Sequence, residues 1–472
     1  MKLDKRVFIN TTYYSEEKLN SLINMVANAN SYNIQLVIGT NDPTKYAKLK
    51  NKVSDRIEIS KMPISFYNKR TNHNKLNENL ITTIQAILND QATTLFLDRH
   101  HQKFAKTYYG PGIHNYYRYV TALIVENFTY LESINLDYIY FTSTPHQIET
   151  WITSRVAESL GIKIILSHLS PVPWRSSLYF GIGKDREIFK IKDKNITRAD
   201  EDIDKLNKWI QNVKGEYQDA IPEYERKRLE FNKGKHFNII SEVRRFWQKP
   251  HFIFNKYKCY RTYSKLSIKD IKGDYVVFFL HYQPERTTLP EAYGFTEQTI
   301  ALLAIRAALP DNIKIIVKEH PSTFTNMCPP KHRHPSFYND ILAINNVELA
   351  DINISSFKLI DNAITTVTLT GTVGVETLLR GKPTVYMGVP IIRDTIGVHV
   401  YESVVELKKY FKQCIIGFNK ETIISNTENV LKKTLNNSIP RISDYAKGIE
   451  KITYKFDLQY LEAFIKAEDE AN

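Results

Sequence analysis

The chain has 472 residues, which is too long for one ordinary hydrophobic core, so we expect two domains of roughly 200 residues each. Its 42% hydrophobic and 24% charged residues are typical of a folded, soluble protein. The start, MKLDKRVFINTTYY, lacks the apolar core of a signal peptide, and no apolar run is long enough to span a bilayer. The formal net charge of +13 favours an anionic partner: a sugar nucleotide, a nucleic acid or an acidic lipid surface.

The three cysteines are far apart in the sequence and show no CxxC spacing. They are Cys259, Cys328 and Cys414. This pattern is typical of free thiols in a reducing compartment, and it indicates neither a disulfide framework nor a zinc site. We therefore expect the protein in the cytoplasm.

The N-terminal half alternates short β-rich runs with amphipathic helical stretches. Strands are predicted over 5–14, 32–40, 93–101, 136–144 and 162–168, and helices over 15–31, 74–89, 115–133 and 147–161. This alternation indicates parallel βαβ units in a doubly wound α/β sheet. We assign residues 1–245 to this first domain, with an exposed helical insertion over about 184–235.

Ligands of such sheets bind beyond the carboxyl ends of the strands, which makes Asp98–His101 and Ser143–His146 candidate site loops. His146 and Glu149 are three positions apart at a helix start, so both can face one side and act as a general base toward a sugar hydroxyl. The alternative is that Thr144 caps the helix and both residues only decorate its first turn. Asp98 is a further catalytic candidate, or one member of a polar cluster that closes a buried strand.

The His-His and His-x-x-Glu spacings in these loops also raise the question of a metal. No third ligand follows at a recognisable spacing, so no metal site is predicted. Further along, Ser167–Gly181 is a Pro-rich segment whose Trp174 and Arg175 can stack on sugar rings and bind carboxylates, or simply hold a loop on the core.

Basic and aromatic residues interleave over Val243–Lys265, in VRRFWQKPHFIFNKYKCYRTYSK. This mixture suits an anionic membrane surface, because the rings settle at the headgroup level and the cations meet the lipid charge. It would also suit single-stranded nucleic acid. The plain alternative is an interdomain linker, which we place at 246–268.

A second βαβ series begins at residue 269 and forms a C-terminal domain over 269–472. Strands are predicted over 275–281, 313–321, 347–354, 364–371 and 382–388, and helices over 296–309, 336–343, 355–363 and 373–380. Two terminal helices, from about Glu421 and over about 439–467, are expected to cross back to the first domain.

Two strand ends of this second sheet carry a pattern suited to a nucleotide. One strand ends on Lys318-Glu319-His320-Pro321, where Lys318 and His320 add positive charge or donors. The other leads into TGTVGVE, a tight turn before a helix. A turn before a helix also occurs in α/β proteins that bind nothing there, which is the alternative for both ends.

The turn itself offers an anion site. Gly371 and Gly374 permit close approach of the backbone and positive φ, and the amides at the helix start point outward. Thr370 and Thr372 add hydroxyls, and Glu376, one turn into the helix, can accept from both hydroxyls of a ribose.

The segments YQPERTT, IVKEHPS, TGTVGVETLLRGKPTVYMG and TPHQIETWITSRVAESLGIK resemble the bacterial capsule polysaccharide biosynthesis glycosyltransferases, a group that includes transferases for Kdo and other nonulosonic acids. The resemblance implies a GT-B fold, in which two Rossmann-like domains face a cleft. It also implies that His320 meets the phosphate of a CMP leaving group, and that Gln283, Glu285 and Thr288 line the cleft. Gly371 stands where related enzymes often have a hydroxyl, so a contact there must come from its amide.

The resemblance implies transfer of a nonulosonic acid such as Kdo or pseudaminic acid from its CMP form to a surface glycan or lipid-linked acceptor. It implies no metal and no cofactor beyond the donor, and a location at the inner face of the membrane. The alternatives are the same fold with a UDP- or GDP-sugar, a nucleic-acid-binding protein, and a non-catalytic protein of capsule assembly or export.

Overall fold

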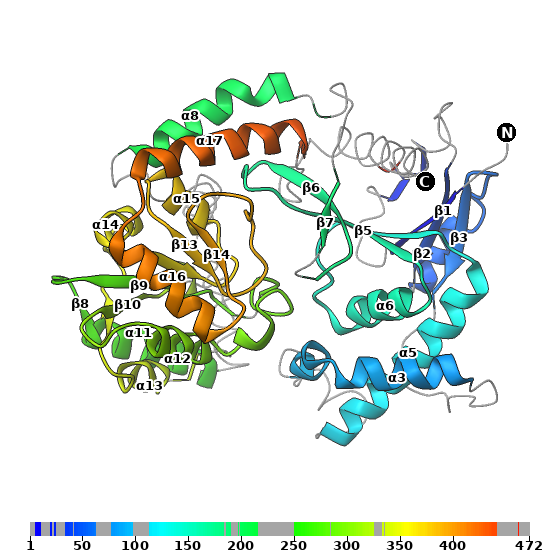
Figure 1. The fold of residues 1–472 in the computed structure, drawn as a ribbon. Coiled ribbons are helices and arrows are strands. Elements are labelled where there is room, and N and C mark those ends of the chain that lie inside the picture. The colour runs from blue at the N-terminus through cyan, green and yellow to red at the C-terminus, as the bar shows by residue number, and fades with distance from the viewer. Residues whose placement is uncertain are drawn as a thin grey trace. The chain divides into compact units, whose positions relative to one another are not determined.

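A computed structural model describes residues 5–10, 19–20, 23–24, 34–40, 42–62, 77–97, 113–183, 186–189, 197, 199–215, 250–283, 285–324, 333–334, 336–440 and 461. The chain forms two compact units (Figure 1). Unit 1 consists of Met1–Asp202 and Lys433–Asn472, and unit 2 of Ile203–Lys432.

Unit 1 is built on an 8-stranded sheet in the order β15-β6-β5-β4-β1-β2-β3, with β7 paired to β6. Its strands are β1 Lys5–Asn10, β2 Ile34–Thr40, β3 Ile57–Lys61, β4 Tyr138–Phe141, β5 Lys163–Leu169, β6 Arg175–Phe180, β7 Glu187–Ile188 and β15 Ile439–Pro440. Strands β1 to β5 run parallel, and β6 joins β5 in antiparallel register. Because the apolar strands are buried, the sheet forms the core of this unit.

The helices of unit 1 depart from the predicted pattern in two places, because α2 was not predicted and residues 91–97 are helical where a strand was expected. They are α2 Pro43–Leu49, α3 Glu78–Asn89, α5 Ile113–Ile134, α6 Ile148–Ser159 and the 3-10 turn η2 Ala199–Asp202. The predicted strand over 93–101 is wrong, because residues 91–97 are helical. The Asp90 carboxylate accepts from the amide and the hydroxyl of Thr93 at 3.3 and 3.0 Å, so it caps a new helix start and overrides the β-branched run.

The Pro-rich segment after β5 is a hairpin with β6, and Arg175 lies inside it without solvent exposure. Its guanidinium forms an ion pair with Asp202 at 3.0 Å and donates to the carbonyls of Thr197, Leu435 and Ser438. Arg175 therefore secures the returning chain next to β15 and does not face solvent as a carboxylate ligand. The second terminal helix does not begin at Ile439, because Ile439–Pro440 is β15.

Unit 2 is built on a 7-stranded sheet in the order β14-β13-β12-β9-β10-β11-β8, and every strand pair in it is parallel. The strands are β8 Ser267–Ile268, β9 Tyr275–Phe279, β10 Lys314–Lys318, β11 Val347–Ala350, β12 Thr366–Thr368, β13 Thr384–Tyr386 and β14 Val398–Val400. The chain proceeds from β9 outward through β10 and β11, then returns to place β12 on the other side of β9. The strand order thus reverses between β9 and β12.

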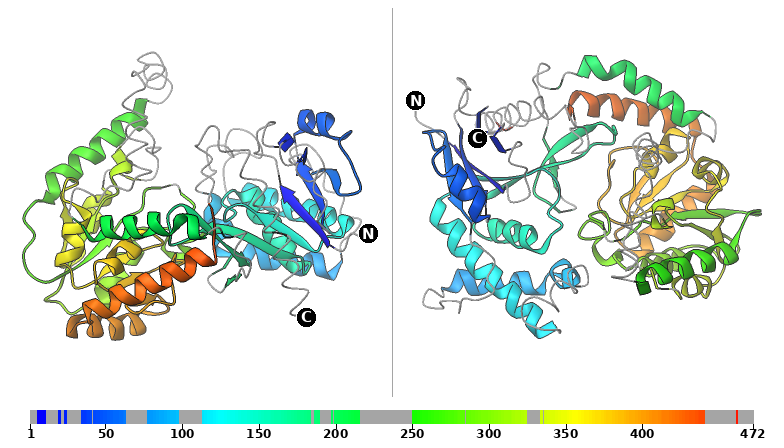
Figure 2. Two further views of the ribbon diagram at one scale, coloured as in Figure 1. Left: turned by 90° about the horizontal axis from the view of Figure 1, so that it is seen from above. Right: turned by 180° about the vertical axis from the view of Figure 1, so that it is seen from behind.

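Helices cover both faces of this sheet (Figures 1 and 2). They are α8 Ile203–Lys214, α11 Pro250–Leu266, η4 Tyr293–Phe295, α12 Gln298–Ala308, η5 Pro321–Phe324, α13 Phe337–Leu342, α14 Ser356–Asn362, α15 Val373–Leu379, α16 Val404–Ile416 and α17 Lys420–Asn436. The predicted α/β fold class, with two doubly wound sheets, is therefore confirmed.

The boundaries of the units differ from the predicted domains in three places. The segment Lys433–Asn472, expected in the C-terminal domain, belongs to unit 1. Helix α8, expected in an exposed insertion of the first domain, buries Leu206, Ile210 and Val213 and belongs to unit 2. Helix α11, expected within a linker, buries Cys259 and Tyr263 in the core of the same unit. In both helices the apolar residues recur at helical spacing, and this periodicity is masked in the sequence by a high density of charge.

None of the helices in the described part of the chain is long and apolar enough to cross a membrane.

Candidate functional site

The loops that follow β9 and β12 meet where the strand order of unit 2 reverses. A Cβ atom placed on Gly371 would lie 3.4 Å from both Cε1 and Nε2 of His281. Next to it, the Thr370 hydroxyl donates to the Thr287 carbonyl at 3.3 Å. In doubly wound sheets the crevice at this reversal is where ligands bind. The structure thus brings the predicted Gly-Thr turn to the expected binding edge.

The two glycines of the turn act differently from the prediction, because neither Gly371 nor Gly374 has positive φ. The space beside Gly374 is filled from within: a Cβ there would lie 2.2 Å from the hydroxyl oxygen of buried Tyr386. Gly374 is therefore required for packing and not for close approach to a ligand. Gly371 is required for the close approach of its loop to Thr368 and His281.

Helix α15 begins at Val373, as predicted, with Thr372 as its N-cap residue and no side-chain cap. The Gly371 amide donates to the Thr368 hydroxyl at 3.2 Å, and the Gly374 amide donates to the Gly371 carbonyl at 3.2 Å. The amides of Thr372 and Val373 have no acceptor among the described residues. These two N–H groups can donate hydrogen bonds to an anion. Glu376 lies one turn further and is half-buried.

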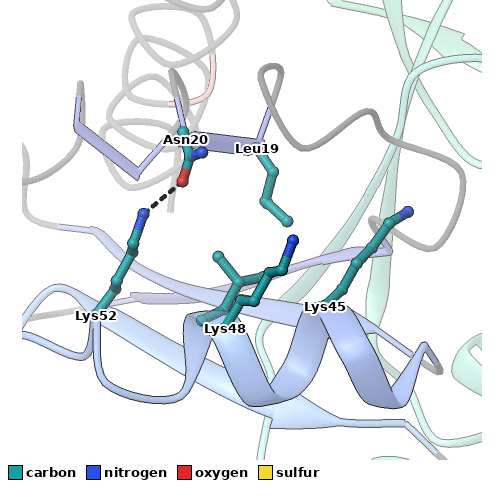
Figure 3. Close-up of a pocket in the computed structure, with 6 residues that line it drawn as sticks. Leu19, Asn20, Lys45, Lys48 and Lys52 are labelled. Carbon is teal, nitrogen blue, oxygen red and sulfur yellow. Dashed lines mark hydrogen bonds between the residues drawn. The ribbon is translucent and has the colours of Figure 1, made fainter.

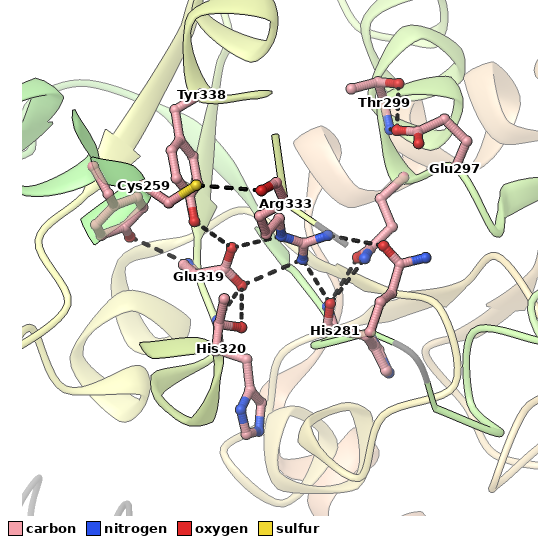
Figure 4. A network of polar contacts seen from close by, with 12 residues as sticks. Cys259, His281, Glu297, Thr299, Glu319, His320, Arg333 and Tyr338 are labelled. Atoms are coloured by element: carbon pink, nitrogen blue, oxygen red, sulfur yellow. Dashed lines mark hydrogen bonds and ion pairs between the residues drawn. The ribbon is translucent and has the colours of Figure 1, made fainter. Parts of the chain in front are cut away.

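A buried polar network lies behind the end of β10 (Figure 4). Glu319, without solvent exposure, accepts from Arg333 Nε at 2.9 Å and from the Tyr338 hydroxyl at 2.8 Å. It also accepts from the Thr323 hydroxyl at 3.0 Å and the His320 amide at 2.8 Å. Burial raises the pKa of Glu319, but the Arg333 charge and these hydrogen bonds outweigh it and lower the pKa overall.

Glu319 belongs to the strand end predicted to bind a nucleotide, but its hydrogen bonds give it a structural role. All its contacts point into the protein, and the His320 ring points away from the network (Figure 4). Glu319 thus holds the backbone from which His320 projects. His320 itself is half-buried and lies against Tyr282, with ring centroids 5.1 Å apart. The neighbouring Pro321 opens the 3-10 turn η5.

The sequence interpretation missed Arg333 and His281. Arg333 donates from Nη2 to the His281 carbonyl at 2.7 Å and from Nη1 to Gln283 Oε1 at 2.9 Å, so one guanidinium joins the ends of β9 and β10. No motif spacing marks Arg333. His281 could have been found, because it ends the predicted strand 275–281.

The His281 ring is buried beside the turn. Burial, followed by the charges of His320 and Arg333, lowers its pKa to about 3, so the ring is neutral at pH 7. Its Nδ1 is buried and has no hydrogen-bond partner among the described residues. Because the His281 ring is neutral, it adds no positive charge to the site.

Lys318 is engaged inside unit 2. Its Nζ donates to the carbonyls of Ile352 and Ile354 at 2.9 and 2.7 Å, and lies 3.4 Å from the Asp351 carbonyl. Since an ammonium has three N–H donors, these contacts occupy it and secure the loop after β11. Burial lowers the pKa of Lys318 to about 8.

The loop after β9 is held by its own side chains. Both carboxylate oxygens of Glu285 accept, from the Tyr282 hydroxyl at 2.9 Å and the Thr287 hydroxyl at 2.6 Å. The buried Thr288 hydroxyl donates to the Glu285 carbonyl at 2.9 Å. Gln283 Nε2 donates to the Thr296 carbonyl at 2.6 Å. Thr288 and Gln283 therefore shape this loop, and Glu285 is fixed on it as an acceptor.

In unit 1, His146 and Glu149 lie near the carboxyl end of β4, as predicted. The His146 Nδ1 lies 3.0 Å from the Thr144 carbonyl, which can only accept, so the neutral ring carries its proton there and Nε2 is the basic nitrogen. Glu149 Oε1 accepts from the Tyr119 hydroxyl at 3.2 Å. The N-cap residue of α6 is Gln147 and not Thr144, and the Gln147 side chain forms no capping hydrogen bond.

Asp98 lies outside the described residues, and the buried strand that was expected to place it is a helix up to residue 97. Within the described ranges, no three His, Cys, Asp or Glu side chains gather in a way that could hold a metal ion.

A separate small pocket of about 170 Å³ lies in unit 1 (Figure 3). It is lined by Leu19, Asn20, Lys45, Lys48, Leu49 and Lys52, and Lys52 donates to Asn20. It includes no predicted site residue, and its lysines rise from a short helix and the turn after it. We therefore place the candidate site at the β9–β12 edge of unit 2.

Residues 205–399 match the sequence model of a family described as capsule polysaccharide biosynthesis protein, and the match lies wholly inside unit 2. Comparison with curated proteins gives no match.

Solved structures give distant likenesses. The UDP-GlcNAc 2-epimerase from Methanocaldococcus jannaschii is 12% identical, with 90% of this chain and 98% of that chain covered and a TM-score of 0.25. Anabaena Alr3699/HepE in complex with UDP and glucose is 13% identical, with 92% and 97% covered and a TM-score of 0.30. Thermosulfurimonas dismutans KpsC, a beta Kdo 2,4 transferase, is 12% identical, with 63% and 87% covered and a TM-score of 0.29. At these identities and TM-scores the likenesses carry no inference about the activity of this chain.

Proposed function

We propose that the protein is a glycosyltransferase of capsule or lipopolysaccharide synthesis, and that unit 2 binds its nucleotide-sugar donor at the edge between β9 and β12. The observation that carries this proposal is the meeting of His281 and Gly371 at the reversal of strand order. The family match over 205–399 covers this same edge and supports the proposal independently.

In this proposal the donor phosphate lies at the start of α15. The Thr372 and Val373 amides, which have no protein acceptor among the described residues, donate to its oxygens. His320 adds a further donor from the end of β10, and Glu376 accepts from the ribose hydroxyls. Departure of a nucleotide needs its developing negative charge stabilised, and fixed N–H donors do this without rearrangement.

We further propose that the sugar is a nonulosonic acid, such as Kdo or a pseudaminic-type acid, carried by CMP. A CMP phosphate on a 2-keto sugar is a weak base, so it leaves with little acid catalysis. The acceptor is a lipid-linked or growing surface glycan, which places the reaction in the cytoplasm at the inner face of the membrane. A base toward the acceptor hydroxyl comes from His146 or Glu149 of unit 1, and Glu285 faces the donor sugar.

Thermal-shift measurements with CMP, UDP and GDP test the proposal. Stabilisation by CMP alone supports the CMP-sugar donor. Stabilisation by UDP or GDP alone supports a transferase that uses a UDP- or GDP-sugar in place of a CMP-sugar. If no nucleotide stabilises the protein, the proposed donor site is refuted and a non-catalytic role in capsule assembly or export is favoured.

A further inference from the structure

Helix α11 presents an outward face of aromatic and basic side chains. Phe254 and Tyr257 are 65% and 58% exposed, which is unusual for rings of this size. Lys258, Arg261 and Lys265 are exposed as well. At 3.6 residues per turn these five positions lie on one side of the helix. We call them the α11 outer face.

The opposite side of α11 is anchored in unit 2. Cys259 and Tyr263 are 2% and 0% exposed and belong to the core of this unit. The Tyr263 hydroxyl donates to the Ala350 carbonyl, and the Cys259 thiol donates to the Arg333 carbonyl at 3.3 Å. Figure 1 shows α11 beside α13 on this side of the sheet. The outer face is therefore displayed on a rigid element.

The charge of this helix is of one sign. Its 17 residues, PHFIFNKYKCYRTYSKL, contain lysine and arginine but no aspartate or glutamate. Among the described residues, Lys258, Arg261 and Lys265 form no ion pair. The Arg261 guanidinium lies 5.9 Å from the centre of the Tyr257 ring, so cation and ring are presented together. The outer face thus offers positive charge that no acidic side chain among the described residues neutralises.

We propose that the α11 outer face binds an anionic lipid surface. Aromatic rings settle among lipid headgroups, and nearby lysine and arginine side chains are attracted by the negative surface potential. Single-stranded nucleic acid is instead bound along grooves, whereas a helix face is convex. The inference stands independently of the proposed transferase activity.

Co-sedimentation of the full chain with vesicles tests this inference. We expect binding to vesicles rich in phosphatidylglycerol, little binding to pure phosphatidylcholine, and loss of binding as salt is raised. Each basic residue near an anionic surface contributes about a fivefold change in partition, so K258Q/R261Q/K265Q should weaken binding about a hundredfold. The double variant Phe254→Ser/Tyr257→Ser should remove the part of the vesicle binding that persists at high salt.

A matched control carries the same charge change elsewhere on unit 2. Lys408, Lys409 and Lys412 are exposed on α16, and K408Q/K409Q/K412Q should leave vesicle binding nearly unchanged. Equal losses in both triple variants would reduce the effect to net charge and overturn the inference. The inference is also overturned if the wild-type protein does not bind vesicles. The same holds if the α11 variant loses binding to a single-stranded oligonucleotide but keeps its binding to vesicles. The thermal shifts caused by nucleotides should be unchanged in both variants. A negative result for vesicle binding therefore does not affect the proposed donor site.

Discussion

Arg333 Nε lies 2.9 Å from Glu319 Oε2, and the two side chains are 6% and 0% exposed. This buried ion pair joins a residue at the end of β10 to one 14 positions later, and it also carries the hydrogen bonds to the His281 carbonyl and the His320 amide. One carboxylate and one guanidinium thus fix the backbone at the ends of β9 and β10, on one side of the candidate site.

Breaking this pair should be costly. Glu319→Gln keeps the size of the side chain but leaves the buried Arg333 charge unpaired, so we expect the free energy of unfolding to fall by about 3–5 kcal/mol. Chemical denaturation measures this loss. In the exposed pair Glu406–Lys409, Glu406→Gln should cost less than about 1 kcal/mol. Similar losses in the two variants would contradict the structural importance of the buried pair.

A second prediction separates packing from binding at the Gly-Thr turn. Gly374→Ala places a methyl group against the Tyr386 hydroxyl, so we expect a loss of about 1–3 kcal/mol in stability from overpacking. The affinity for a nucleotide should change little at temperatures where the variant is folded. Unchanged stability together with lost nucleotide binding would restore the original interpretation of Gly374 as a point of close ligand approach.

Most elements of unit 2 could be predicted from sequence, because its strands are continuous apolar runs separated by strong turn signals. The strands β9, β10 and β12 and the start of α15 at Val373 lie where the pattern places them. The predicted strand over 93–101 failed because one side chain, Asp90, caps a helix that the β-branched run does not predict.

The network behind the site could not be predicted. Arg333 and Glu319 are brought together by the path of the chain, and the Gly374 contact with Tyr386 joins a helix to a neighbouring strand. No periodicity encodes such contacts. The roles assigned to His320, Glu376 and His146 in binding and catalysis remain predictions.

The buried neutral ring of His281 predicts a pH dependence of stability. Its pKa falls from 6.5 to about 3 in the folded protein, so the unfolded chain binds a proton in this range and the folded protein does not. Stability from this residue is complete above pH 6.5 and is lost as the pH falls toward 3, by about 1.4 kcal/mol per pH unit. In His281→Gln this part of the acid limb should disappear. His114→Gln, on an exposed position of α5, serves as the control.

Lys318 and His320 should respond in opposite ways, although they are two residues apart. Lys318→Met leaves carbonyls of the β11 loop without their donor and should cost about 1–3 kcal/mol in stability. His320→Ala keeps the hydrogen bond from its backbone amide to the Glu319 carboxylate, so the fold should be preserved. Nucleotide binding and sugar transfer should be lost. Denaturation and nucleotide titration of both variants measure the contrast. Full transfer activity in His320→Ala would refute the donor assignment.

Unit 1 supplies the last prediction, which concerns the acceptor hydroxyl. If His146 Nε2 accepts its proton, His146→Gln should lower kcat by about 10²–10⁴-fold and remove the corresponding limb of the pH–rate profile. Donor affinity, measured by nucleotide titration, should be unchanged, because the donor binds unit 2. Glu149→Gln is the matched comparison on the first turn of α6. If Glu149→Gln produces the loss in kcat and His146→Gln does not, the base is the carboxylate. Loss of donor affinity in either variant would show that the residue acts on the fold and not on the acceptor.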